Sequence, residues 1–192
     1  MAEVVVFHHV HGLTRGVMAF AQTLRDAGHA VHAPDLFEGR AFATLDEGLD
    51  YVRSVGFAEI IARGVAAAEN VPATAVYAGF SLGVLPAQYL VQTRQGARGA
   101  VLMHACAPVQ EFGDRWPPEV PVQIHAMNAD RSFVDEGDLD AARDVLSQAD
   151  DGELFLYPGS EHLFADPSLP GYDEAAAEAL QSRVLDFLRC AG

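Results

Sequence analysis

A serine between two glycines directly follows an apolar run near the middle of the chain. The stretch reads YAGFSLGVLP at residues 77–86, with Ser81 between Gly79 and Gly83. Small residues two positions before and after a serine let a strand and a helix approach closely, and the hydroxyl is then raised above the sheet as a nucleophile. A serine can also lie in such a corner for structural reasons. Its role therefore depends on whether the chain supplies a base and an orienting acid.

The chain supplies both groups beyond the serine. A serine hydroxyl is a weak nucleophile that needs a histidine base held by a carboxylate. Asp130 follows the apolar run at 120–127, and His162 follows the run at 153–158. Alone, Asp130 would more often be a turn or helix-capping residue, and His162 an ordinary loop histidine. With Ser81 they occur in the chain order of the α/β-hydrolase fold, serine, aspartate, histidine, and this combination predicts a catalytic triad.

Short apolar runs alternate with longer amphipathic stretches along the whole chain. The runs lack the polar alternation of a half-exposed strand, which is typical of parallel strands covered by helices. We predict an α/β fold with one domain over residues 1–192 and a mostly parallel central sheet with helices on both faces. The expected strands lie at 3–9, 30–35, 74–80, 99–105, 120–127 and 153–158. The expected helices lie within 14–29, 57–71, 82–96, 135–152 and 173–192.

The composition and the net charge of the chain exclude some classes of binding partner. The 192 residues include 12 basic and 27 acidic side chains, which gives a formal net charge of −15. Such a surface repels nucleic acids and anionic membranes, so we expect neither as a partner. The N-terminal stretch lacks the pattern of a signal peptide, and no apolar run reaches the length of a membrane span. Two cysteines are too few for a disulfide framework, and we expect a cytoplasmic monomer or homodimer.

An acyl-transfer site also needs two hydrogen-bond donors for the oxyanion of the tetrahedral intermediate. We expect one donor to be the backbone N–H of Leu82, directly after the serine. The second should come from the loop after the first strand, which reads HHVHGL at 8–13. In this loop the N–H of Val10 is the first candidate and that of Leu13 is the alternative.

The same loop contains three histidines, His8, His9 and His11. Clustered histidines can bind zinc, but no Asp or Glu ligand follows at metal-site spacing, and neighbouring residues of a strand point to opposite faces. We therefore expect no metal and no cofactor, and we place His9 and His11 in the lining of the substrate pocket. Five aromatic residues near predicted strand ends could complete an apolar pocket, with core packing as the alternative: Phe37, Phe80, Trp116, Phe133 and Phe164.

Two longer stretches resemble the dienelactone hydrolase family. DAGHAVHAPDLFEGR at 26–40 is similar to the family's second strand and the loop after it, and YPGSEHLFADPSLPGYDEAAAEAL at 157–180 is similar to its catalytic-histidine segment. The resemblance covers nearly the whole chain and implies a small single-domain α/β hydrolase without a lid domain. It implies the same triad and the same oxyanion donors: Ser81, Asp130 and His162, with Val10 and Leu82.

The sequence departs from the founding enzymes of that family at three positions. Ser81 stands where those enzymes have a cysteine nucleophile, which implies ordinary ester hydrolysis. His9 stands where a glutamate takes part in activating that cysteine. Asp166 stands where an arginine helps to hold the carboxylate of dienelactone, and an acid there would repel an anionic substrate. In addition, Pro86 removes a backbone donor from the helix after the serine and can bend that helix.

These residues predict a serine hydrolase that cleaves a small ester or lactone through an acyl-enzyme. A thioesterase or transferase is an alternative that would need a basic groove for coenzyme A, and the nearby cations are Arg15, Arg40, Arg53 and Arg63. A catalytically weak or inactive small-molecule binding protein with the same fold is the other alternative. The segment at 46–57 is too short for a lid domain, so we expect an open or shallow site.

Overall fold

The strands form a single parallel sheet. In the computed structural model, which describes residues 1–191, six strands pair in the order β2-β1-β3-β4-β5-β6 and every neighbouring pair is parallel. The strands are β1 Glu3–Phe7, β2 Ala30–His32, β3 Val76–Phe80, β4 Gly99–Met103, β5 Val122–Met127 and β6 Gly152–Tyr157. Each strand overlaps one of the six runs that the sequence predicts, and the predicted α/β class is confirmed.

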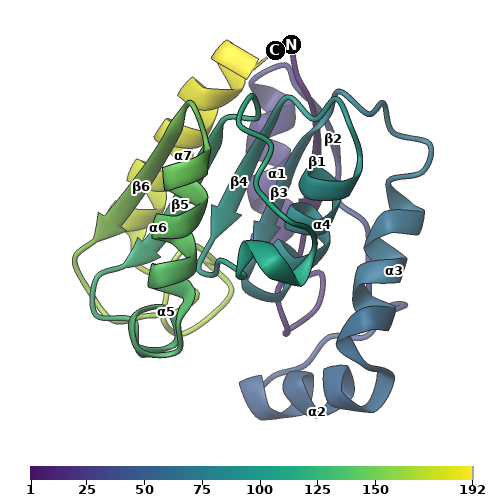
Figure 1. Cartoon of the computed structure of the whole chain (residues 1–192). Coiled ribbons are helices and arrows are strands. Elements are labelled where there is room, and N and C mark those ends of the chain that lie inside the picture. Colours follow the sequence, from purple (N-terminus) through teal and green to yellow (C-terminus); the bar gives the residue numbers. More distant parts are fainter. Residues whose placement is uncertain (192) are drawn as a thin grey trace.

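Helices cover both faces of this sheet (Figure 1). One face carries α1 Arg15–Asp26 and α7 Glu174–Ala191, and the other carries α3 Phe57–Ala67, α4 Val84–Thr93 and α6 Asp138–Gln148. Two further helices, α2 Leu45–Val55 and α5 Arg131–Asp135, lie toward the edge where the strands end, and the start of the chain and the end of α7 lie together at the opposite edge. None of the helices in residues 1–191 is both long and apolar enough to cross a membrane.

Burial follows the position of each strand in the sheet. Every residue of β3, β4 and β5 is buried, because these strands have neighbours on both sides and helices on both faces. On β5, Ile124 joins the core on one face and Met127 joins the core on the other. The edge strands differ from the prediction of two covered faces. On β6, Leu156 remains 44% exposed.

The chain order reverses between β1 and β3. From β1 the chain crosses to β2 at one edge, whereas β3 leads through β4 and β5 to β6 at the other edge. Loops that leave neighbouring strands in opposite directions open a crevice at the carboxyl ends, and α/β sheets bind their ligands there. The crevice lies between the loop after β1 and the turn after β3, which is where Ser81 is found.

The turn after β3 brings backbone into close contact with backbone. A Cβ atom on Gly79 would overlap the carbonyl oxygen of Gly83, and a Cβ atom on Gly83 would overlap the carbonyl oxygens of Phe7 and His8. The short 3-10 turn η1 Ser81–Gly83 and the start of α4 therefore lie directly against the end of β1. Both glycines are needed for this approach, because neither site leaves room for a side chain.

Two helices were not expected from the sequence. α2 begins after Thr44, whose hydroxyl accepts a hydrogen bond from the N–H of Glu47 while the Glu47 carboxylate accepts one from the N–H of Thr44. The residues TLDE at 44–47 are the sequence signature of this capping box. α5 spans only the five residues Arg131–Asp135. α2 is a single helix, and no lid domain occurs within residues 1–191.

Pro86 does not interrupt α4. It is the third residue of the helix, and the N–H groups of the first turn have no partner within a helix, so a missing donor there costs little. The proline ring is buried and packs against α3 at Gly64, where a Cβ atom would overlap it. The helix continues through the proline as far as Thr93.

We expect Gly79→Ala to lower the free energy of unfolding by about 2 kcal/mol or more, because the new methyl group meets fixed backbone atoms. Gly113→Ala is the matched control, since its methyl group would have only the Gln92 side chain as a neighbour, at 3.6 Å. The control should change the free energy of unfolding by less than about 0.5 kcal/mol. Urea denaturation measures both values, and equal values would contradict the close packing of this turn.

Candidate active site

Ser81, His162 and Asp130 lie in one hydrogen-bonded row. The Ser81 Oγ is 2.8 Å from the His162 Nε2, and the His162 Nδ1 is 2.7 Å from the Asp130 Oδ2. An ionised carboxylate only accepts hydrogen bonds, so the Nδ1 carries the proton and the Nε2 is left to accept the Ser81 hydroxyl. The structure thus brings together the three side chains that the sequence singles out as a triad.

The backbone at Ser81 has an unusual conformation. Its φ angle is +47°, a left-handed value that a residue with a side chain seldom adopts. The tight turn imposes this value, because β3 ends at Phe80 and α4 starts only three residues after Ser81. The serine hydroxyl is thereby raised above the carboxyl edge of the sheet, and the positive N-terminal end of α4 points toward it.

Asp130 has two functions in the structure. Its Oδ1 accepts a hydrogen bond from the Ser132 N–H at 3.0 Å, which caps α5, while its Oδ2 faces His162. The aspartate is buried, whereas the His162 side chain is 26% exposed. The helix-capping alternative that the sequence left open is therefore compatible with the triad, since one carboxylate oxygen serves each partner.

The loop between β1 and α1, residues 8–14, lies beside the serine. A Cβ atom on Gly83 would overlap the carbonyl oxygens of Phe7, the last residue of β1, and of His8, the first residue of this loop. The N–H of Val10 donates no hydrogen bond within residues 1–191, and Leu82 directly follows the serine in the 3-10 turn. The two backbone donors that the sequence predicts thus belong to the two segments that meet at the crevice.

The three histidines of the β1–α1 loop bind three different groups. The His8 Nε2 accepts from the Leu36 N–H at 2.9 Å, and the His11 Nδ1 lies 3.0 Å from the Phe42 carbonyl oxygen. The His9 Nε2 lies 2.8 Å from the Asp166 Oδ2. Within residues 1–191 no group of three or more His, Cys, Asp or Glu side chains could hold a metal ion.

A small cleft adjoins His162. Its volume is about 190 Å³, and its lining is mainly apolar. The side chains come from the β1–α1 loop, from the start of α2 and from the loop between β6 and α7, residues 158–173: His11, Leu45, Glu161, His162, Leu163, Leu169, Pro170 and Gly171. Glu161 is the only carboxylate in this lining, and no arginine or lysine belongs to it.

Of the residues predicted to line the pocket, only His11 borders this cleft. The His9 side chain is fully buried and binds Asp166, so it has no surface for a ligand. The five predicted aromatic residues are at most 1% exposed and pack in the two cores, where they have no surface for a substrate: Phe37, Phe80, Trp116, Phe133 and Phe164. The alternative of core packing holds for them, because ring-sized apolar surface is buried wherever strands meet helices.

Sequence reasoning missed the contribution of α2. Leu45, the first residue of α2, borders the cleft, and a Cβ atom on Gly48 would overlap the Val10 carbonyl oxygen. The helix thus packs directly on the β1–α1 loop. The capping signature at 44–47 could have predicted this helix, but no sequence feature indicates that it packs against the crevice.

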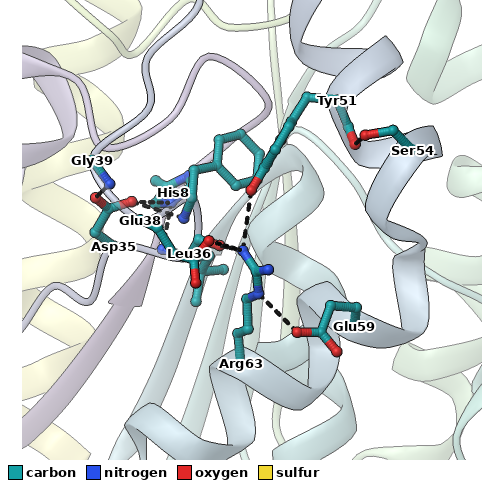
Figure 2. Close-up of polar contacts among 10 residues, drawn as sticks. His8, Asp35, Leu36, Glu38, Gly39, Tyr51, Ser54, Glu59 and Arg63 are labelled. Atoms are coloured by element: carbon teal, nitrogen blue, oxygen red, sulfur yellow. Dashed lines mark hydrogen bonds and ion pairs between the residues drawn. The ribbon is translucent and has the colours of Figure 1, made fainter.

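Arg63 attaches α2 and the loop after β2 to α3 (Figure 2). Its guanidinium donates to the Leu36 carbonyl oxygen at 3.0 Å and to the Tyr51 hydroxyl at 3.1 Å, and it pairs with Glu59 at 3.0 Å. These contacts raise the pKa of Arg63, with the hydrogen bond to Glu59 as the largest cause. Arg40 lies over the Tyr51 ring at 5.2 Å. Arg53 pairs with Asp50 at 3.0 Å. Three of the four arginines considered for a coenzyme A groove thus bind groups of the protein itself.

A fully buried histidine lies beside His162. His104 directly follows β4, has a φ angle of +71°, and lies with its ring centroid 6.1 Å from that of His162. Neither of its ring nitrogens has a hydrogen-bond partner in residues 1–191. Burial lowers its pKa well below the usual value, so it packs as a neutral ring. The rule that located Asp130, a polar residue just after a buried strand, would also have found His104.

A larger groove, of about 940 Å³, runs between α3, α4 and the 3-10 turn η2 Val109–Glu111. Its lining is mostly apolar and includes Phe57, Ile61 and Phe112. It contains none of the triad residues. This groove therefore does not coincide with the row of Ser81, His162 and Asp130, and we assign the site by chemistry rather than by size.

Comparisons with known proteins identify the family and the fold. A sequence model of the Dienelactone hydrolase family matches residues 1–191, and no curated protein matches the chain. A candidate dienelactone hydrolase from Klebsiella pneumoniae subsp. pneumoniae has a TM-score of 0.77 at 19% identity, over 98% of this chain and 87% of that chain. The dienelactone hydrolase-like promiscuous phosphotriesterase P91, from metagenomic libraries, has a TM-score of 0.75 at 20% identity over 98% and 86%. At these identities the structural likeness shows the α/β-hydrolase fold alone.

Buried neutral histidines make stability depend on pH. Burial lowers the pKa of His8 to about 4 and that of His125 to about 3, whereas an unfolded histidine titrates near 6.5. Between about pH 6.5 and pH 4 the unfolded chain takes up protons that the folded chain does not. The free energy of unfolding must therefore fall as the pH falls through this window.

We expect His125→Asn to reduce this dependence. The asparagine can still bind the Tyr157 hydroxyl, which lies 3.0 Å from the His125 Nδ1, but it does not titrate. The slope of the free energy of unfolding between pH 5 and pH 6 should decrease by about 1 kcal/mol per pH unit. Urea denaturation over this range measures the slope, and the same slope in both proteins would show that His125 is not held neutral.

Proposed function

The chain belongs to the dienelactone hydrolase family, and from this premise we propose that it is a serine hydrolase that cleaves a small uncharged ester or lactone through an acyl-enzyme. The observation that carries the proposal is the row from Ser81 through His162 to Asp130, with spacings of 2.8 and 2.7 Å. The left-handed backbone of Ser81 supports it, because strain of this kind persists where packing enforces it and is common at reactive residues.

The first half of the reaction forms the acyl-enzyme. The His162 Nε2 takes the hydroxyl proton of Ser81 as the Oγ attacks the carbonyl carbon, and the carbonyl oxygen becomes an oxyanion. The N–H groups of Leu82 and Val10 donate to that oxyanion. When the C–O bond to the leaving group breaks, His162 returns the proton to the departing alkoxide. An ester releases an alcohol at this point, and a lactone ring opens.

The second half consumes water. His162 removes a proton from a water molecule, the resulting nucleophile attacks the acyl carbon, and the collapse of the second tetrahedral intermediate restores the Ser81 hydroxyl. The products are a carboxylic acid and an alcohol, or one hydroxy acid from a lactone. Asp130 stays ionised throughout, because its task is to fix the imidazole tautomer and to stabilise the imidazolium.

The cleft beside His162 supports a small uncharged substrate. About 190 Å³ of mainly apolar space accommodates a short acyl or alkyl group. The Glu161 carboxylate borders this space. This negative group, together with a net charge of −15, disfavours a substrate that carries its own carboxylate.

We predict that an alkyl fluorophosphonate labels Ser81 covalently, and that Ser81→Ala removes both the labelling and the hydrolysis of short aryl esters. The expected loss in kcat is about 10³-fold or more, because the members of a triad act as a unit. Ser147→Ala is the control, since Ser147 is an exposed serine on α6. Mass spectrometry and ester hydrolysis give the two readouts, and normal turnover by Ser81→Ala would reject the nucleophile.

We also predict a preference for neutral substrates that depends on Glu161. Aryl esters of a simple carboxylic acid should be hydrolysed faster than half-esters of a dicarboxylic acid of equal length. Glu161→Gln should raise kcat/KM for the anionic ester about fivefold relative to the neutral ester, because one exposed charge at close range contributes about 1 kcal/mol. Asp150→Asn removes the same charge at the opposite edge of the sheet and should leave the ratio unchanged; equal ratios in all proteins would refute the role of Glu161.

A further inference from the structure

Asp166 is a buried carboxylate that the proposed reaction does not use. It is 1% exposed, and it accepts four hydrogen bonds. The His9 Nε2 and the Thr14 Oγ1 bind its Oδ2 at 2.8 and 2.5 Å, and the Ser168 N–H and Oγ bind its Oδ1 at 2.7 and 2.5 Å. A Cβ atom on Gly16 would overlap the carboxylate. The group therefore lies against the N-terminal turn of α1, where the helix dipole stabilises a negative charge.

The hydrogen bonds of His9 determine which of its nitrogens carries the proton. The His9 Nδ1 accepts from the backbone N–H of His11 at 3.3 Å, so the proton is on the Nε2, which donates to Asp166. Burial lowers the pKa of His9 and keeps the ring neutral. Burial also opposes the ionisation of Asp166, but hydrogen bonds from His9, Ser168 and Thr14 outweigh it and lower the pKa of this carboxyl.

This pair connects two loops that are distant in sequence. His9 belongs to the β1–α1 loop and Asp166 to the β6–α7 loop, 157 residues apart. The His9 ring binds Asp166 on one side and the N–H of His11 on the other. Val10, the proposed oxyanion donor, lies between His9 and His11 in the chain. The same β6–α7 loop contains His162, so the pair joins the segment that supplies the base to the segment that supplies the oxyanion donor.

We propose that the hydrogen bond between His9 and Asp166 is a positioning contact. It holds the Val10 N–H and the His162 imidazole at fixed positions relative to each other on the two sides of the crevice. The inference rests on the proposed function, since it concerns the oxyanion donor of that reaction. An oxyanion donor is effective only at hydrogen-bond distance from the developing charge. A shift of about 1 Å in a reacting group can lower the rate about 10²-fold. Neither His9 nor Asp166 touches the substrate in this account.

Two substitutions of His9 separate its two hydrogen bonds. Asparagine places a polar atom near the position of the Nδ1, so His9→Asn can still accept from the His11 N–H but cannot reach Asp166. Glutamine places its amide nitrogen near the position of the Nε2, so His9→Gln can still donate to Asp166. Titration of Ser81 with fluorophosphonate counts the folded active sites, and kcat is expressed per titrated site. A purely structural loss would then lower the count and leave kcat unchanged.

We expect His9→Asn to lower kcat about 10²-fold at a nearly constant KM, and His9→Gln to restore most of the loss. The affinity for an alkylboronic acid should fall in parallel with kcat, because its tetrahedral adduct on serine places an oxygen at the oxyanion position. Val145→Ala is the control for stability. It removes buried volume from α6, and it should lower Tm without changing kcat or the affinity for the boronic acid.

A double-mutant cycle tests the connection itself. In the double variant His9→Asn/Asp166→Asn, kcat should be no lower than in the worse single variant, because the second substitution removes a contact already lost. Three results would overturn the proposal. The losses in kcat of the two single variants could multiply in the double variant, His9→Asn and His9→Gln could lose kcat equally, or His9→Asn could keep the kcat of the wild type. If the wild-type protein neither hydrolyses esters nor reacts at Ser81, both the proposed function and the positioning role of His9 and Asp166 are rejected. If the wild type is active and His9→Asn is equally active, only the positioning role is rejected.

Discussion

A contact between backbone atoms at the end of β3 determines the geometry of the site. Gly79 and Gly83 let the turn approach the end of β1 so closely that a methyl group would not fit at either position. The turn between them forces Ser81 into a left-handed conformation, with φ at +47°. Such strain persists only where the surroundings over-determine it. Here the surroundings are β3, buried along its whole length, and the α4 helix that starts immediately after the turn.

Two buried aspartates organise the carboxyl edge of the sheet. A buried carboxylate is costly unless several donors satisfy it, and both aspartates meet this requirement with a histidine and a backbone N–H. Asp130 holds His162, which faces Ser81. Asp166 holds His9, which faces the backbone of the β1–α1 loop. A similar set of hydrogen bonds thus occurs twice at one edge, once at the side chain that we propose as the base and once at the loop opposite it.

The fold and the hydrogen-bonded row of Ser81, His162 and Asp130 could be predicted from the sequence, because both follow local rules. Six apolar runs indicated the strands, and a polar residue just after each of three of them indicated Ser81, Asp130 and His162. The pocket was not accessible in this way. Whether an aromatic ring such as Phe164 faces a cleft or the core depends on how layers pack, which no single stretch reveals. His9 and Asp166 are 157 positions apart in the sequence, so no local pattern indicates that they pair. From their residue types alone we expected two unrelated roles: His9 as a residue of the pocket lining and Asp166 as an acid that repels anionic substrates.

The most direct test of the account is to trap the acyl-enzyme with an aryl carbamate. Such a compound transfers its carbamoyl group to the serine of a serine hydrolase, and the carbamoyl–serine bond is then hydrolysed only slowly. The account predicts that activity is lost as one carbamoyl group is gained, and that peptide mapping by mass spectrometry finds this group on Ser81. Loss of activity with the carbamoyl group on another residue, or ester hydrolysis by a protein that the carbamate never modifies at Ser81, would contradict it.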